Sequence, residues 1–277
     1  MMHSTYVPGP PLSDFVDMFW FYEGGVPQHA KERVLPSGCG QLFVNLQEDR
    51  FRVYDPQGHD KCISFPGCLM SGPHSEFVVI DTANQASIIG IAFKPGGAFP
   101  FFNSPASELH NLQVPLELLW GSQAGYLREQ LLEARTTEAR FRLLEQYLLA
   151  QAGWPGAPAF DRHPAVAFAL KELGGSMSRR TVSEVTDQIG LSARRFIQVF
   201  SEEVGLTPKL YCRVRRLQEA LGLVSKKRTV DWAALAARSG YFDQAHFIHD
   251  FRAFSGLNPS TYLANRGEYQ NHVALPD

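Results

Sequence analysis

The sequence predicts an α+β protein of two domains: an N-terminal β-barrel or sandwich of the cupin-like kind with a helical hairpin, and a C-terminal all-α domain. Residues up to about 102 form short runs of β-branched and aromatic residues that turn residues separate. From residue 104 onward the apolar residues recur at helical spacing. Residues 152–164 are rich in proline and glycine, which is typical of a linker. The expected domains are therefore residues 1–151 and 165–265.

The first domain contains the predicted strands. They are the runs VDMFWFYEGG, QLFVNL, FRVYD, CISF, SEFVVID and ASIIGIAFKPGG. Because no helical pattern lies between these runs, they indicate an antiparallel sandwich or barrel. Short helices are expected at SPASELHN and VPLELLWG, and two longer helices form a hairpin within residues 122–151. The hairpin has more apolar residues than one face needs, so we expect either burial of both faces or a two-fold dimer contact.

The second domain reads as helical throughout. A helix near residues 165–173 ends at Gly174, and further helices follow. The residues expected to cap or separate these helices are Thr181 or Ser183, Gly190, Ser192, Pro208, Asp231, Gly240 and Asp243.

Charge is distributed unevenly along the chain. The net charge of −2 is the sum of −7 over residues 1–161 and +5 over residues 162–277. A basic C-terminal part behind an acidic N-terminal part indicates that one domain meets phosphate and the other does not. The chain has no signal peptide pattern and no apolar run long enough to span a membrane, and its four cysteines form no CxxC pair. We therefore expect a cytoplasmic protein.

An internal repeat is the most informative feature. The repeated pairs, each 51 residues apart, are Phe196 and Phe247, Phe200 and Phe251, Gly205 and Gly256, Pro208 and Pro259, and Tyr211 and Tyr262. Self-similarity of this kind indicates two copies of one supersecondary unit. Each copy reads as a short helix, a glycine-containing turn and a capped second helix, which is the helix-turn-helix layout. The alternative interpretation is a helical bundle with no DNA-binding role.

The motifs GLSARRFIQVFSEEVGLTPKLYCRVRRLQEAL and WAALAARSGYFDQAHFIHDFRAFSGLNPSTYL carry a family resemblance. The segment from about 178 to 263 resembles the double helix-turn-helix domain of the AraC/XylS family. ERVLPSGCGQLFVNL and GIAFKPGGAFPFF resemble the N-terminal domain of one AraC subgroup. The resemblance implies a bacterial transcription regulator, an activator associated with the nucleoid, that binds double-stranded DNA. It also implies a small-molecule effector and RNA polymerase as partners.

The second helix of each copy supplies the candidate DNA contacts. Arginine can bind guanine with two donors, glutamine can do the same for adenine, and an apolar side chain can touch the thymine methyl. The candidate base-reading residues are Arg194, Ile197, Gln198, Gln244, His246 and His249. The candidate phosphate contacts, which fix register without reading sequence, are Ser192, Arg195, Lys209, Arg213 and Arg216. Gln198, Ile197 and His249 depart from the residues frequent in the AraC/XylS family, so the target sequence does not transfer from relatives.

Few residues of the sequence point to an enzyme. The candidate metal ligands, His29, His59, His74 and His110, are widely separated and form no His-x-His pair. A further group, Cys39, Cys62 and Cys68, is expected to be buried and structural, since free cysteine often behaves as a small core residue. We therefore expect no catalysis, no metal and no cofactor. Two alternatives stay open: an N-terminal domain that serves protein–protein contact only, and a barrel enzyme fused to a DNA-binding tail.

Overall fold

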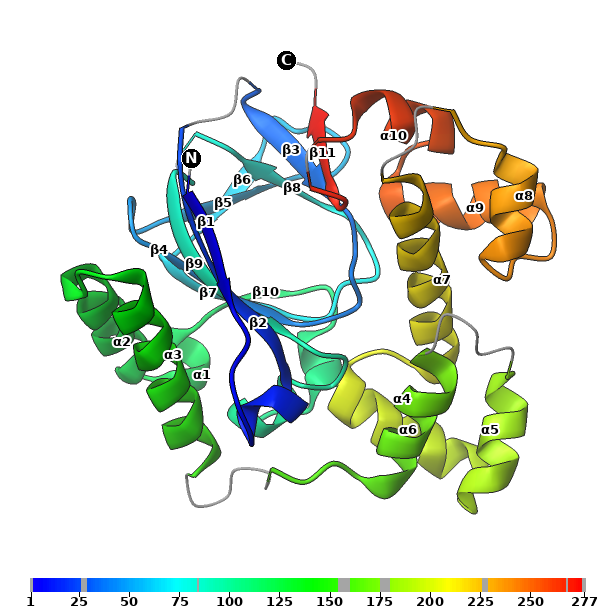
Figure 1. Ribbon diagram of the computed structural model, residues 1–277, viewed down its shortest axis with the longest axis horizontal. Helices are drawn as coiled ribbons and strands as arrows, with labels where there is room; N and C mark the ends of the chain where they lie inside the picture. The colour runs from blue at the N-terminus through cyan, green and yellow to red at the C-terminus, as the bar shows by residue number, and fades with distance from the viewer. Residues whose placement is uncertain are drawn as a thin grey trace.

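Two antiparallel sheets form the N-terminal domain (Figure 1). The computed structural model describes residues 2–25, 29–83, 85–153, 160–174, 180–225, 229–267 and 269–275. One sheet has the order β1 (Met2–Tyr6), β2 (Val16–Glu23), β9 (Ser87–Phe93), β4 (Gln41–Asn45), β7 (Cys68–Ser71) and β10 (Gln113–Pro115). The other has the order β11 (His272–Leu275), β3 (Lys31–Val34), β8 (Val78–Asp81), β5 (Phe51–Tyr54) and β6 (Cys62–Phe65). Neither sheet closes on itself, so the fold is a sandwich and not a closed barrel.

Strand alternation places one face of the six-stranded sheet against the helical hairpin. Phe19 and Phe21 of β2 are fully buried, as are Ile89 and Ile91 of β9, because alternate residues of a strand point to the same face. They share one core with α2 (Gln123–Glu133) and α3 (Thr137–Ala152), where the ring of Phe141 lies 6.3 Å from that of Phe19. The predicted hairpin is thus confirmed, and it covers the outer face of this sheet.

The hairpin and the short helix before it also expose apolar side chains. Leu127, Leu131, Leu144 and Leu148 are fully or almost fully buried. The exposed apolar residues of this region are Leu118, Tyr126, Leu132 and Leu149, at 76%, 54%, 44% and 43%. The expectation that the hairpin buries both faces within the monomer is therefore wrong at Tyr126, Leu132 and Leu149. Leu118 lies in α1 (Glu117–Trp120), which follows the 3-10 turns η1 (Leu12–Asp14), η2 (Phe99–Phe101) and η3 (Ala106–Leu109) in chain order.

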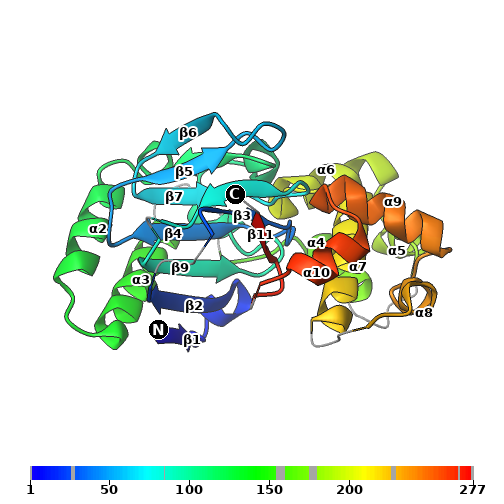
Figure 2. The same cartoon turned by 90° about the horizontal axis from the view of Figure 1, so that it is seen from above.

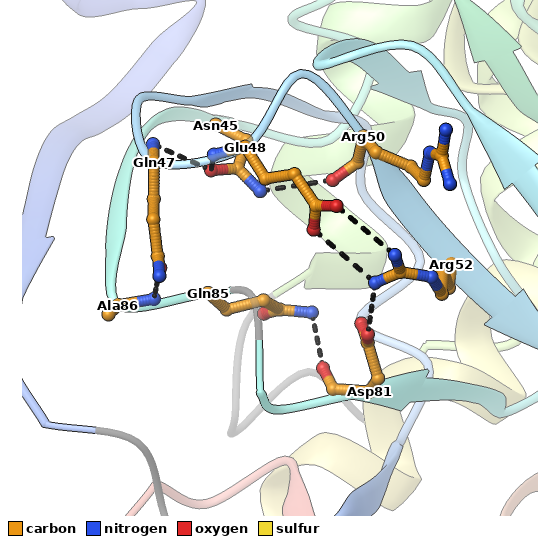
Figure 3. A network of polar contacts seen from close by, with 8 residues as sticks. All are labelled: Asn45, Gln47, Glu48, Arg50, Arg52, Asp81, Gln85 and Ala86. Carbon is orange, nitrogen blue, oxygen red and sulfur yellow. Dashed lines mark hydrogen bonds and ion pairs between the residues drawn. The ribbon is translucent and has the colours of Figure 1, made fainter.

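An ion-pair network ties the five-stranded sheet to a neighbouring turn (Figure 3). Arg52 of β5 donates to Glu48 at 3.2 Å and to Asp81 of β8 at 3.0 Å. Asn45 completes the turn, since its side chain donates to the carbonyl of Arg50 and accepts from the backbone NH of Gln47. The side chain of Asp81 is only 9% exposed, so the pair with Arg52 compensates a charge that burial would otherwise disfavour.

The helical domain is built around α7 (Pro208–Val224). In Figure 1 one group of helices lies at its lower end and the other at its upper end, and Figure 2 shows both groups beside the sandwich. The first group is α4 (Pro164–Gly174), α5 (Val182–Ile189) and α6 (Ala193–Val204). The second group is α8 (Trp232–Arg238), α9 (Gln244–Ser255) and α10 (Pro259–Asn265). Of the predicted linker 152–164, residues 154–159 lie outside the described part of the chain.

The end of the chain contradicts the expectation that everything after the linker is helical. Strand β11 pairs antiparallel with β3, so that His272 lies opposite Val34 and Leu275 opposite Lys31. The predicted second domain ended at residue 265, and the partner of HVAL lies near the other end of the sequence. Strands β1, β3, β7 and β10 were missed because their runs, MHSTY, KERV, CLMS and QVP, each contain at most two β-branched or aromatic residues.

The cysteines differ in their surroundings, and the described residues contain none in a disulfide. Cys68 is buried, and burial raises its thiol pKa to about 12. Burial likewise raises the pKa of the half-buried Cys39 to about 11. Cys62 lies exposed on β6, so the expectation that it is buried is wrong, because β6 is an edge strand whose residues are largely exposed.

Candidate nucleic-acid interface

The first helix-turn-helix unit consists of α5, a glycine turn and α6. Thr181 caps the start of α5 and forms a capping box with Glu184, in which each side chain accepts from the other residue's backbone NH. Gly190 ends α5 with a φ of 74°, a conformation that glycine adopts without steric cost. Ser192 then caps α6, since its hydroxyl accepts from the backbone NH of Arg195 at 3.3 Å. The predicted capping of both helices is confirmed.

The second unit repeats this construction with α8 and α9. The carboxylate of Asp231 accepts from two backbone NH groups at the start of α8. Gly240 has a φ of 76° in the turn, and the carboxylate of Asp243 caps α9 by accepting from the backbone NH of His246 at 2.7 Å. The two units thus share their order of elements and the position of their caps.

The aromatic residues of the repeat pack in the same way in both units. The ring centroids are 5.6 or 5.7 Å apart, at interplanar angles from 63° to 66°, in the pairs Phe196–Phe200, Phe200–Tyr211, Phe247–Phe251 and Phe251–Tyr262. All of these rings are buried. In each unit the i+4 phenylalanine therefore packs on the tyrosine of the following helix and the i phenylalanine packs on the i+4 phenylalanine, so the sequence repeat is a structural repeat.

The second helix of the first unit, α6, has a polar outer face. Arg194, Arg195, Ile197 and Gln198 are exposed, and 43% of Ile197 is accessible. The side-chain amide of Gln198 donates to Glu202 at 2.8 Å. The three candidate base readers of this unit therefore lie together on the accessible surface of one helix.

The second helix of the second unit, α9, distributes its candidate readers differently. Gln244 and His249 are exposed, with 80% of the His249 side chain accessible. His246 is half-buried, because its ring lies edge-on against Tyr241 with centroids 5.3 Å apart and its Nε2 lies 3.9 Å from Asp250. The structure thus places His249 on the outer face and His246 beside it, toward α7.

The candidate phosphate contacts on α7 are engaged within the protein. The guanidinium of Arg213 donates to both carboxylate oxygens of Asp250 on α9, at 2.7 and 3.3 Å, and lies 4.9 Å from the ring of Phe254. This hydrogen bonding raises the pKa of Arg213. Arg216 donates to the carbonyl of Gly240 and its guanidinium lies 5.0 Å from the Tyr241 ring. Both arginines hold the second unit on α7, so a phosphate role for them stays a prediction, as it does for the exposed Lys209 and Arg195.

Residues on α9 that were absent from the predicted site could have been identified from the repeat itself. An offset of 51 relates Arg194 to Ala245, Ile197 to Ile248 and Gln198 to His249. The same offset relates Ser201 to Arg252, which is exposed. A shallow hollow on the outer face of α9 is lined by Ala245, Ile248, His249, Arg252 and Ala253. Arg252 therefore adds a cation to this face that the candidate set lacked.

The N-terminal domain contacts both units at the glycines that end their second helices. Gly205 ends α6 with a φ of 83°, and a Cβ at this position would lie 2.4 Å from Pro73 Cγ. Gly256 ends α9 with a φ of 66°, and a Cβ there would lie 2.6 Å from the Phe77 ring. The segment 73–77, which precedes β8, therefore touches both units at equivalent places.

Polar and apolar contacts extend this domain contact. Arg33 of β3 is 7% exposed, donates to the Ser255 carbonyl at 2.9 Å and stacks 4.2 Å from the centre of the Phe77 ring. Leu35 and Val273 are buried in the core of the helical domain. Val273 nevertheless lies in β11, and Leu35 directly follows β3, so both belong to strands or loops of the sandwich. Movement of the sandwich would therefore disturb the core beneath both units.

The described ranges of the chain lack both a metal-ligating cluster and a membrane-spanning helix. Within these ranges no group of three or more His, Cys, Asp or Glu side chains could hold a metal ion. In the same part of the chain no helix is long and apolar enough to cross a membrane.

Comparison with known families matches two separate parts of the chain. Residues 4–115 match a domain of unknown function, DUF6597, and residues 185–265 match a helix-turn-helix domain. An uncharacterized HTH-type transcriptional regulator of Haemophilus influenzae is 30% identical over 81 residues, which are 29% of this chain. The matched part spans only 27% of the length of that relative.

Comparison with solved structures finds ToxT from Vibrio cholerae. One ToxT structure covers 95% of this chain and 98% of its own length, with a TM-score of 0.49 and 7% identity. Another, described as bound to unsaturated fatty acid, covers 88% of this chain and 93% of its own, with a TM-score of 0.44 and 12% identity.

Proposed function

We propose that this chain, in which residues 185–265 are an AraC-type helix-turn-helix domain, is a sequence-specific DNA-binding transcription regulator. The observation that carries the proposal is the structural repeat. The helices α6 and α9 are each fixed by a buried phenylalanine pair, and each has an accessible outer face. In a helix-turn-helix unit this helix enters the major groove. Two such helices joined by α7 suit two successive grooves, about 34 Å apart.

Base reading is assigned to the outer faces of these two helices. Arg194 and Gln198, one helical turn apart on α6, have the donors and acceptors that guanine and adenine require. On α9, His249 and Gln244 are accessible, and Arg252 adds a donor. The exposed Arg195 and Lys209 suit phosphates beside the groove, and the amide groups at the Ser192 cap suit a further phosphate.

The N-terminal domain, residues 1–151, is proposed to sense a small molecule and to control how the two units meet DNA. The supporting observation is that segment 73–77 contacts Gly205 and Gly256, so that a change in this segment reaches both units together. The alternative is that this domain serves protein–protein contact only. A ligand that binds the folded state raises the melting temperature by mass action, so a screen of metabolites by thermal melting separates the two.

Association with other chains is a further part of the proposal. The exposed Leu132 and Leu149 of the hairpin favour a homodimer contact within residues 122–151. Sedimentation of the full chain beside Leu132→Lys and Leu149→Lys variants tests it, and a monomer at tens of micromolar removes it. Contact with RNA polymerase and a place on the bacterial nucleoid are further parts of the proposed regulatory role.

Selection of bound fragments from random duplex DNA tests the function as a whole. We expect recovery of a defined sequence, an affinity that falls with salt, and two footprints per monomer about 10 base pairs apart. Binding without sequence preference contradicts a regulator of specific operators. A single short footprint per monomer means that only one unit reads DNA.

A further inference from the structure

Isoleucine occupies the same position in both second helices. Ile197 lies on α6, and Ile248, 51 residues later, lies on α9. Each directly follows the buried phenylalanine that fixes its helix, Phe196 or Phe247. The two isoleucines are therefore placed on their helices by the same packing, at the edge of the outer face.

The core buries neither isoleucine completely. Ile197 is 43% exposed, whereas Phe196 beside it has no accessible surface. Ile248 packs partly against the core and lines the shallow hollow on α9, together with Ala245 and Ala253. Both units thus present apolar surface beyond the part that the core covers.

The groups around each isoleucine are suited to DNA. Arg194 and Gln198 flank Ile197, and His249 and Arg252 flank Ile248. These flanking side chains carry hydrogen-bond donors, and two of them are cationic, which complements the phosphates and base edges of a duplex. An apolar side chain surrounded by such donors and cations suits an apolar group within a DNA groove better than it suits a hydrophobic protein surface.

Duplex DNA has one apolar group of this kind. The C5 methyl of thymine lies in the major groove, and it distinguishes thymine from cytosine by apolar contact. We propose that Ile197 and Ile248 each contact a thymine methyl, so that the operator has a thymine at the equivalent position of two elements about one helical turn apart. This inference rests on the proposed DNA-binding function. Because the flanking residues differ, the two elements share this thymine and differ at neighbouring bases.

A scan that replaces each thymine of the selected operator by deoxyuridine tests the inference, because uracil lacks only the methyl group. With the unmodified full-length protein, we expect two positions where the replacement weakens binding by about fourfold, the effect of one buried methyl-sized group. With Ile197→Ala the first position becomes insensitive to the replacement, and with Ile248→Ala the second does. Ile248→Val preserves more of the packing and is expected to reduce the sensitivity in part.

Ile63→Ala is the matched control, since Ile63 is 67% exposed on β6 in the other domain, and it should leave both sensitivities intact. The inference is overturned if the unmodified protein shows fewer than two methyl-sensitive positions. It is also overturned if the sensitivities survive in both alanine variants. If the unmodified protein selects no sequence at all, the proposed function fails instead. The scan with the unmodified protein finds the methyl-sensitive positions, and the alanine variants and Ile248→Val assign them to the isoleucines.

Discussion

At the scale of single residues, arginines that look alike in the sequence have different roles in the structure. Arg194 is exposed on α6, whereas Arg213 pairs with Asp250, whose side chain is only 3% exposed. Arg213→Ala leaves this buried carboxylate without the two hydrogen bonds of the guanidinium, so we expect the free energy of unfolding to fall by about 1–3 kcal/mol. Arg194→Ala should change it by less than about 0.5 kcal/mol and weaken binding at one base position by about 1–3 kcal/mol. Urea unfolding and binding to operator variants measure both.

A double variant provides the control for this pair. Arg213→Ala combined with Asp250→Asn removes the unpaired charge, and it should recover part of the lost stability. If Arg213→Ala instead leaves stability unchanged and flattens the salt dependence of DNA binding by about one unit, Arg213 is a phosphate contact.

His74 predicts a dependence of stability on pH. Its ring is 8% exposed, and Nε2 lies 3.0 Å from the Gln113 amide. Burial, and after it the neighbouring His110, lower its pKa from 6.5 to about 4. The unfolded chain therefore binds the proton more tightly, so stability is complete above about pH 6.5 and is lost as the pH falls toward 4. The loss should approach ~3 kcal/mol.

Urea unfolding at several pH values measures this loss, with His74→Gln as the comparison. Glutamine can accept the same hydrogen bond and does not titrate, so the variant should show a shallower dependence. Part of the dependence should persist, because burial also lowers the pKa of His110, against the opposing charge of Glu76. Equal slopes in both proteins would mean that His74 does not titrate in this range.

At the scale of elements, the features that depend on local periodicity, such as helix caps and buried helix faces, could be predicted from the sequence. The caps at Ser192, Asp231 and Asp243 and the buried phenylalanines were recoverable because each depends on residues within one or two helical turns. Strand β11 was not recoverable, because the bond between His272 and Glu32 joins residues 240 apart in the chain. The pairing of Arg213 with Asp250 also depends on how α7 meets α9, which no local pattern encodes.

Strand β11 gives a prediction of its own. Val273 is 1% exposed, and its side chain belongs to the core of the helical domain while its backbone pairs with β3. Val273→Asp buries a charge there, so we expect a loss of about 2–4 kcal/mol in the free energy of unfolding. Val7→Asp is the control, because Val7 is 67% exposed and should tolerate the change within about 0.5 kcal/mol. Similar losses in both would mean that β11 contributes nothing to the core.

At the scale of the whole molecule, the two halves are joined by contacts that are equivalent in the two repeats. Gly205 and Gly256 each end a second helix, and each admits the N-terminal domain only because it lacks a Cβ. Gly190 has the same left-handed conformation, with a φ of 74°, but nothing would lie within 4 Å of a Cβ there. The chain therefore contains glycines with the same backbone requirement that differ in whether they face the other domain.

This difference separates backbone strain from domain contact. Gly190→Ala and Gly205→Ala should both lose about 1–2 kcal/mol, because a non-glycine residue is strained in the left-handed conformation. Only Gly205→Ala should also push the domains apart, since its Cβ would lie 2.4 Å from Pro73 and 2.9 Å from the Ala106 carbonyl. Small-angle scattering should then show a larger radius of gyration for Gly205→Ala than for Gly190→Ala. DNA affinity should also differ between them if the contact governs how the units reach DNA. Identical scattering and identical affinity in the two variants would show that the contact yields locally and that segment 73–77 does not control the reading helices.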